Sequence, residues 1–102
     1  MLETAFLCLA MNVYHEARNQ SFIGQVAVAQ VVMNRVKDDR FPNDACSVVT
    51  QGQTYSWKPD VPIRNRCHFS WYCDGKSDKP RDEQAWEMSK LVASGVLFGH
   101  LD

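Results

Sequence analysis

Hydrophobic positions recur with a helical period in two long segments near the N-terminus. Residues 4–18 place apolar side chains three or four positions apart, at Phe6, Leu9, Ala10, Val13 and Ala17. Residues 22–37 are apolar nearly all round, and Ser21 before them is a good N-cap. We therefore predict two helices, and we expect the second to be the buried, central helix of the core.

The pattern changes in the middle of the chain. A short third helix is predicted over residues 45–51, with Asn43 or Asp44 as its N-cap. From Gly52 to Gly75, β-forming aromatic residues are interrupted by prolines. This composition predicts a small β-hairpin or an irregular lobe.

Helical spacing returns toward the C-terminus. We expect a last helix that starts at Ser77 or Asp78, carries Pro80 near its first turn and ends at Gly99. The chain has 102 residues and 45% hydrophobic residues, enough for one small core. The predicted fold is a single α+β, mostly helical domain over residues 1–102.

Charge and hydropathy narrow the possible partners. Eleven Lys and Arg stand against 12 Asp and Glu, and this near-neutral balance argues against a nucleic-acid binder but not against a sugar-like ligand. No apolar run approaches the ~18–20 residues of a membrane span, so no membrane insertion is expected. The N-terminal segment lacks a basic start and a small-residue cleavage site, so we expect no signal peptide. We also expect a monomer.

The four cysteines are too sparse for a disulfide scaffold. Cys8 falls in the apolar stripe of the first helix, which suits a small core residue. One disulfide among Cys46, Cys67 and Cys73 is expected if the protein works in an oxidising place.

Neither a metal site nor a cofactor is predicted. His15-Glu16 begins the zinc-protease pattern H-E-x-x-H, but Asn19 occupies the position of the second histidine. The cysteines lack the paired spacing of zinc ligands. A nucleophile pair of Cys67 with His15 or His100 has no support in the local sequence.

Glu16 is the strongest candidate for chemistry. It follows Val13 by three positions and Leu9 by seven, which places it at the edge of the apolar face. A carboxyl group there is expected to be partly desolvated, which disfavours its charged form. Such a group can serve as the general acid of a glycosidase. The alternative is an ordinary helix-terminal glutamate paired with Arg18 or another cation.

Two further sets of side chains have both a structural and a functional interpretation. Gln25 interrupts the buried second helix and needs a hydrogen-bonding partner there. Aromatic rings in the middle of the chain belong either to the core or to a cleft rim on which a saccharide stacks; they are Tyr55, Trp57, Phe69, Trp71 and Tyr72.

Several blocks of sequence, in order, closely resemble the SleB-type spore cortex-lytic, cell-wall hydrolase family. The first block is Tyr14-His15-Glu16-Ala17-Arg18, followed by Gly24-Gln25-Val26-Ala27-Val28-Ala29 and Val32-Met33-Asn34-Arg35-Val36. The later blocks are Phe41-Pro42, Cys46-Ser47-Val48-Val49-Thr50-Gln51 and Cys67-His68-Phe69-Ser70-Trp71-Tyr72-Cys73-Asp74-Gly75. The resemblance covers roughly residues 8–99.

The resemblance implies a lysozyme-like fold and cleavage of peptidoglycan glycan strands by a lytic transglycosylase or muramidase. Glu16 matches the acid that protonates the oxygen between N-acetylmuramic acid and N-acetylglucosamine. As a base, the same residue would help the 6-hydroxyl of the muramic acid form a 1,6-anhydro product. Phe69 and Ser70 match the block beside that acid. With them we group the remaining candidate substrate contacts, which are Trp71, Tyr72, Gln25 and Tyr55.

Two departures from the family pattern qualify this expectation. The family reads E-A-R-G-E where this chain has Asn19 and Gln20, so the second carboxylate is an amide. The family domain continues past the last helix into a D-x-T-x-G-A segment, so one wall of the groove is expected to be absent or to lie outside this sequence. Without a signal peptide, the enzyme would act at the bacterial wall, in the periplasm, as a phage endolysin released through a holin. The alternatives are a non-catalytic peptidoglycan-binding module and a stem-peptide amidase.

Overall fold

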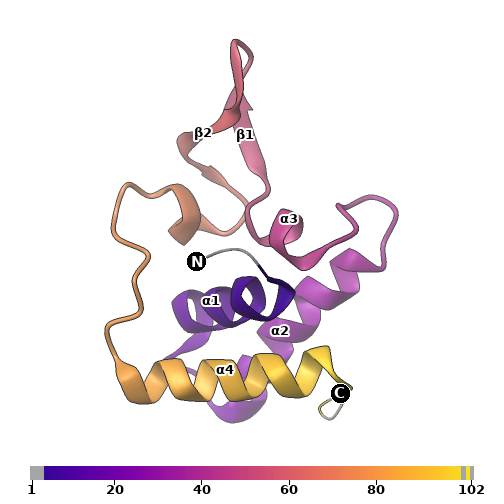
Figure 1. Ribbon diagram of the computed structural model, residues 1–102, viewed down its shortest axis with the longest axis vertical. Coiled ribbons are helices and arrows are strands. Elements are labelled where there is room, and N and C mark those ends of the chain that lie inside the picture. Colours follow the sequence, from indigo (N-terminus) through magenta and orange to yellow (C-terminus); the bar gives the residue numbers. More distant parts are fainter. Residues whose placement is uncertain (1–3, 100, 102) are drawn as a thin grey trace.

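Helices dominate the part of the chain that the computed structural model describes, which is residues 4–99 and 101 (Figure 1). The elements are α1 (Ala5–Ala17), α2 (Phe22–Val36), α3 (Ala45–Val49), β1 (Gly52–Tyr55), β2 (Lys58–Cys67), the 3₁₀ turn η1 (Ser70–Cys73) and α4 (Glu83–Leu97). This arrangement confirms the predicted mostly helical α+β class. The first two helices fall within a residue of their predicted bounds.

Helix α1 is the central helix of the core. It lies between α4 and α3 (Figure 1) and packs against α2, α3 and α4. Most of its residues are buried, including Leu9 and Val13 at 0% exposure. The prediction that α2 is central was wrong. Helix α2 is apolar on more sides than the other elements cover, so Ile23 is 79% and Val31 44% exposed.

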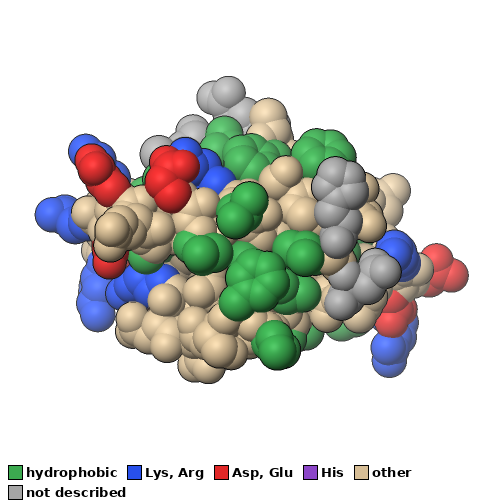
Figure 2. All heavy atoms as spheres, turned by 90° about the horizontal axis from the view of Figure 1, so that it is seen from below, with side chains coloured by type: hydrophobic (Ala, Val, Ile, Leu, Met, Phe, Trp, Pro, Cys, Tyr) green, Lys and Arg blue, Asp and Glu red, His purple; other side chains and the backbone are tan. Residues whose placement is uncertain are grey.

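An apolar surface follows from this layering. Figure 2 shows hydrophobic side chains gathered on the face at the α4 end of the molecule, with charged groups toward its two sides. Leu91 and Phe98 of the α4 region are 61% and 65% exposed. None of the helices within residues 4–99 combines the length and apolar character that a membrane span requires.

Each of the four α-helices begins at a polar N-cap whose side-chain oxygen accepts a backbone N–H three residues later. Thr4 accepts from Leu7 at 3.1 Å and Asp44 from Ser47 at 2.8 Å. Ser21 and Asp82 do the same for α2 and α4. These bonds satisfy N–H groups that have no partner inside the helix. The predicted cap at Ser21 is confirmed, and Asp44 rather than Asn43 caps α3.

Helix α4 begins later than predicted, at Glu83 instead of near Ser77 or Asp78. The preceding segment forms tertiary hydrogen bonds to α1. The Tyr14 hydroxyl accepts the backbone N–H groups of Arg81 and Asp82, each at 3.1 Å. These bonds hold the backbone of Arg81 and Asp82 against the last turn of α1, and residues 74–81 form a loop that passes this end of the helix.

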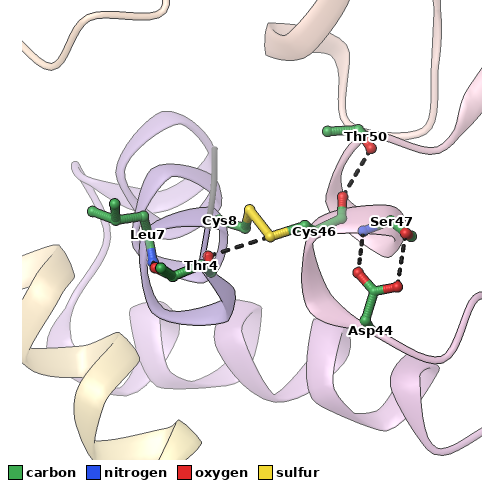
Figure 3. The surroundings of a disulfide bond; sticks show 7 residues. All are labelled: Thr4, Leu7, Cys8, Asp44, Cys46, Ser47 and Thr50. Atoms are coloured by element: carbon green, nitrogen blue, oxygen red, sulfur yellow. Dashed lines mark hydrogen bonds between the residues drawn. A yellow bond between two sulfur atoms is a disulfide. The ribbon is translucent and has the colours of Figure 1, made fainter. Parts of the chain in front are cut away.

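Two disulfides tie the elements together. Cys8 on α1 is bonded to Cys46 on α3 (Figure 3), and Cys67 at the end of β2 is bonded to Cys73 in η1. The expected disulfide among the later cysteines is therefore confirmed. Cys8 is fully buried as predicted, but its interpretation as an unpaired core residue was wrong. The Cys46 sulfur also lies 3.2 Å from the Thr4 carbonyl oxygen; without a thiol proton, this is a van der Waals contact.

The predicted hairpin is present as the antiparallel pair β1–β2, which projects from the helices at one end of the molecule (Figure 1). Its base is closed by a hydrogen bond from the His68 N–H to the Gln51 carbonyl, at 2.9 Å. Gly52 pairs with Cys67 there, and a Cβ atom on Gly52 would lie 2.7 Å from the Cys67 Cα. Only glycine permits this close approach, which fixes the hairpin above η1.

Candidate active site

Glu16 lies on the last turn of α1 and is exposed to solvent. The predicted partial desolvation was therefore wrong. Helical spacing does place this residue next to the apolar edge formed by Leu9 and Val13, which are buried. No spacing rule, however, specifies whether another element covers that edge. The carboxyl group is accessible to a large substrate.

The alternative interpretation, an ion pair between Glu16 and Arg18 or another cation, is absent from the described part of the chain. The ion pairs found there join Arg40 to Asp38 and Lys90 to Glu87. Arg18 instead turns back along α1. Its Nη1 donates to the Tyr14 carbonyl at 3.3 Å, and its guanidinium lies 4.9 Å from the centre of the Tyr14 ring.

Asn12 sits one helical turn before Glu16 and is fully buried. Its Oδ1 accepts a 2.9 Å hydrogen bond from the Trp71 indole N–H. This buried bond joins η1 to α1 directly below the turn that carries Glu16. Sequence reasoning selected Trp71 but missed Asn12, although a polar residue in the apolar stripe four positions before Glu16 was a usable signal.

His15 forms the other link between α1 and η1. Its ring stacks on Trp71, with centroids 4.7 Å apart and planes 15° apart. Its Nε2 lies 2.7 Å from the Asp78 carbonyl oxygen. Since a carbonyl can only accept, Nε2 is the donor and carries the proton. Sequence patterns raised His15 as a zinc ligand and as the partner of a Cys67 nucleophile, but gave no sign of this positioning role.

A pocket of about 410 Å³ opens beside His15, between α1, η1 and the 74–81 loop. Its lining residues are Tyr14, His15, Arg18, Ser70, Trp71, Asp74, Lys76, Ser77, Lys79 and Arg81. Two predicted substrate contacts, Ser70 and Trp71, are among them. Glu16 is not, so this pocket lies around the helix from the candidate acid.

Charge is unevenly distributed in this pocket. Four of its lining side chains are cationic, and Asp74 is its one carboxylate. Asp78 lies close by. Burial raises the pKa of the Asp78 carboxyl above its usual value, and the neighbouring Asp74 charge adds to this effect, while His15 opposes it.

Phe69 and Tyr72, the predicted contacts on either side of Ser70 and Trp71 in the sequence, are not among the residues that line the pocket. Phe69 is 8% exposed and lies under the Arg35 guanidinium at 5.2 Å, so it belongs to the core. Tyr72 meets Trp71 edge-on, with ring centroids 5.9 Å apart. The structure thus groups Ser70, Trp71 and Tyr72 in η1, against the end of α1.

Gln25 and Tyr55 lie on elements outside this group. Gln25 is 6% exposed, and its Nε2 donates to the Gln20 carbonyl at 3.2 Å, which fixes the turn between α1 and α2. Tyr55 lies at the end of β1, where its ring is 5.1 Å from that of Trp57. Trp57 itself is 74% exposed, which gives the hairpin tip an open aromatic surface.

The structure also bears on two other possibilities raised by the sequence, a Cys67 nucleophile and a metal site. Cys67 is bonded to Cys73, so it is not a free nucleophile, and His100 lies outside the described residues. Across the described residues, no three His, Cys, Asp or Glu side chains come together as a metal site would require.

A sequence model of the Cell Wall Hydrolase family matches residues 19–100, so the chain belongs to this family. The match begins three residues after Glu16. Spore cortex-lytic enzymes are similar over 55 residues, with 46% identity in Bacillus subtilis (strain 168), 44% in Halalkalibacterium halodurans and 40% in Bacillus cereus. These matches confirm the resemblance to the SleB-type family.

The matches to these relatives are partial. The aligned segment covers 54% of this chain and 18%, 17% and 21% of the three relatives, respectively. The similarity therefore spans about a fifth of the length of each relative. No solved structure matches the chain.

Proposed function

We propose that this domain cleaves the glycan strand of peptidoglycan at the β-1,4 bond between N-acetylmuramic acid and N-acetylglucosamine, with Glu16 as general acid and then base. The observation that carries the proposal is an accessible carboxyl, not paired with Arg18, at the end of the central helix of a cell wall hydrolase domain. Its openness leaves room for a polymer to approach. The bonds of Asn12 and His15 to Trp71 and Asp78 hold the surrounding turn in place.

The reaction needs one protein carboxyl. Glu16 donates its proton to the glycosidic oxygen as the bond from C1 of the muramic acid to that oxygen breaks. The 6-hydroxyl oxygen of the same sugar then bonds to C1, and its proton passes to Glu16. This sequence regenerates the acid and consumes no water. It also fits Gln20, an amide that cannot supply the second carboxylate of a two-carboxylate glycosidase.

The remaining candidate residues have different roles in this proposal. Ser70 contacts the substrate directly, because it is exposed and lines the pocket beside the turn that carries Glu16. Trp71 is 5% exposed, so it supports this surface from within, through its bond to Asn12 and its stacking on His15. Tyr72 supports Trp71 from its edge. Phe69 shapes the core next to η1, and Gln25 fixes the turn that follows α1 through its bond to the Gln20 carbonyl. A lysozyme-like organisation, in which a helix carries the acid beneath a β-hairpin lobe, is part of the proposal.

Tyr55, together with Trp57, offers a stacking surface for saccharides farther along the strand. The wall is the proposed place of action, in the periplasm, after release through a holin during phage lysis. The two disulfides support an oxidising place of action.

Mass spectrometry of digested peptidoglycan tests the reaction and the residue together. Wild-type protein should release muropeptides with 1,6-anhydro ends, which are one water lighter than hydrolysed ends. Glu16→Gln should abolish release because the amide cannot donate the proton. Glu87→Gln, which alters another exposed helical glutamate, serves as the matched control and should keep full activity.

Each alternative predicts a different result. Undiminished release by Glu16→Gln would refute the role of Glu16. Hydrolysed ends in place of anhydro ends would indicate a muramidase. Free stem peptides with intact glycan would indicate an amidase, and wall binding without any release would indicate a binding module.

A further inference from the structure

The pocket beside His15 is lined by positively charged side chains that take no part in the proposed cleavage reaction. We infer that this pocket binds the anionic stem peptide carried by the muramic acid at the scissile bond. This inference deepens the proposed function and rests on it. It predicts an enzyme that prefers peptide-bearing strands to bare glycan.

The first argument is electrostatic. Arg18, Lys76, Lys79 and Arg81 line the pocket, with Asp74 as the single lining carboxylate. Over the described residues, none of the four cations has a carboxylate oxygen within 4.0 Å, as the ion pairs there lie elsewhere. The net charge of the chain is −1, yet its described part gathers at one place positive charge that no described carboxylate pairs with. Such a place attracts carboxylates.

The second argument is that the pocket is built before any ligand arrives. Trp71 and His15 form a stacked aromatic wall. The loop opposite is fixed by its bonds to the Tyr14 hydroxyl and to the His15 ring. The pocket also offers Ser70 and Ser77 as polar lining residues beside the charges. Apolar surface beside charged and polar groups suits a peptide with both alanyl methyl groups and carboxylates.

The third argument is reach. His15 lines the pocket and Glu16 is the next residue, about 100° around a helix whose diameter is about 10–12 Å. The stem peptide branches from the same sugar whose C1 would react at Glu16. An extended peptide spans roughly 3.3–3.6 Å per residue, so three or four residues can pass around α1 into the pocket.

Phosphate polymers of the wall present a similar charge, but the reaction disfavours them. They are attached through the 6-hydroxyl of the muramic acid, the group that the proposed transglycosylation consumes. A sugar that carries such a polymer could not form the anhydro ring. Peptide carboxylates leave that hydroxyl free, so they are the anion compatible with cleavage at the same residue.

A binding measurement tests this inference independently of catalysis. Calorimetric titration of the Glu16→Gln protein should give about tenfold tighter binding of a disaccharide tetrapeptide than of the same disaccharide without peptide, and the difference should shrink with added salt. Replacing Lys76, Lys79 and Arg81 together with Gln should remove the difference. These side chains are exposed, so the fold should tolerate the change, which circular dichroism checks.

The control replaces three exposed cations outside the pocket, Lys37, Lys58 and Arg66, with Gln. It changes the net charge equally and should keep the preference for the peptide. Equal binding of the two disaccharides by the Glu16→Gln protein, or an equal loss in the control, would overturn the inference. Preference for a glycerol phosphate oligomer over the peptide ligand would assign the pocket to phosphate polymers instead.

Digestion of intact and peptide-stripped strands by the wild-type protein distinguishes the two proposals. If no strand is cleaved but the peptide preference in binding holds, the proposed reaction fails and the pocket assignment stands. If both strands are cleaved at the same rate, the reaction stands and the pocket assignment fails.

Discussion

The disulfide between Cys8 and Cys46 joins α1, the central helix, to α3 across 38 residues of chain. We predict that this bond stabilises the domain more than the Cys67–Cys73 bond, which closes only six residues. A cross-link lowers the entropy of the unfolded chain, and the effect grows with the length of the closed loop.

Loop length sets the expected size of the two effects. The chain-entropy relation gives about 4 kcal/mol for the longer loop and about 2 kcal/mol for the shorter one at 25 °C. Small domains unfold with only about 5–15 kcal/mol in total. Loss of Cys8–Cys46 should therefore remove a large part of the stability, whereas loss of Cys67–Cys73 should leave a folded domain.

Reduction in paired variants measures each bond without confusing it with side-chain packing. In Cys67→Ala/Cys73→Ala the longer disulfide remains, and in Cys8→Ala/Cys46→Ala the shorter one remains. Urea unfolding of each variant, with and without a phosphine reductant, gives the free energy of unfolding that belongs to the remaining bond. The same polypeptide is compared in both states, so no cavity enters the difference.

The reasoning fails if reduction costs the two variants the same free energy, or if the shorter bond contributes more. An unchanged slope against urea in the oxidised and reduced states would also contradict it. Opening a long loop should let the unfolded chain expand and expose more surface.

Three further outcomes follow from the structure. Asp44→Ala should lower the free energy of unfolding by about 1 kcal/mol through loss of the α3 cap. Hydrogen bonds from Ser47 lower the pKa of Asp44, so the charged carboxylate stabilises the fold. Urea titrations should therefore show the full loss at pH 7 and a smaller one as the pH falls below about 4. Asp78→Asn should raise the melting temperature at neutral pH, since the raised pKa of Asp78 makes its ionisation unfavourable to folding, and equal gains at pH 3 and pH 7 would contradict this. Ile23→Lys should leave thermal unfolding nearly unchanged, whereas Val32→Lys, at a fully buried position of the same helix, should prevent folding.

Local signals in the sequence predicted much of the fold. The bounds of α1 and α2 followed from hydrophobic period and the cap at Ser21, which act over a few residues. The burial of α2 was misjudged because coverage depends on other elements, and Ile23 has none above it. The start of α4 was misplaced because the Tyr14 hydroxyl, 67 residues before Arg81, takes the N–H groups that a helix would have used.

The candidate site was predictable to a similar extent. The motif around Glu16 singled out the end of α1 as the candidate site, and the structure places Ser70 and Trp71 in a pocket that also includes His15, the residue before Glu16. The partnership of Asn12 with Trp71 spans 59 residues, so no spacing rule could have revealed it. The cationic pocket likewise joins residues of α1 to a distant loop, and the near-neutral composition conceals it.

If Glu16 is the acid, as proposed, its exposure leaves one task of catalysis, the exclusion of water, to the polymer. A lysozyme-type acid works in surroundings that exclude water, and the free protein leaves this side chain open. A long strand lying across the turn would itself supply the cover. Short muropeptides would leave the acid exposed to water, so they should bind but react slowly. Under the proposed function, the domain should therefore cleave an intact wall faster than soluble fragments.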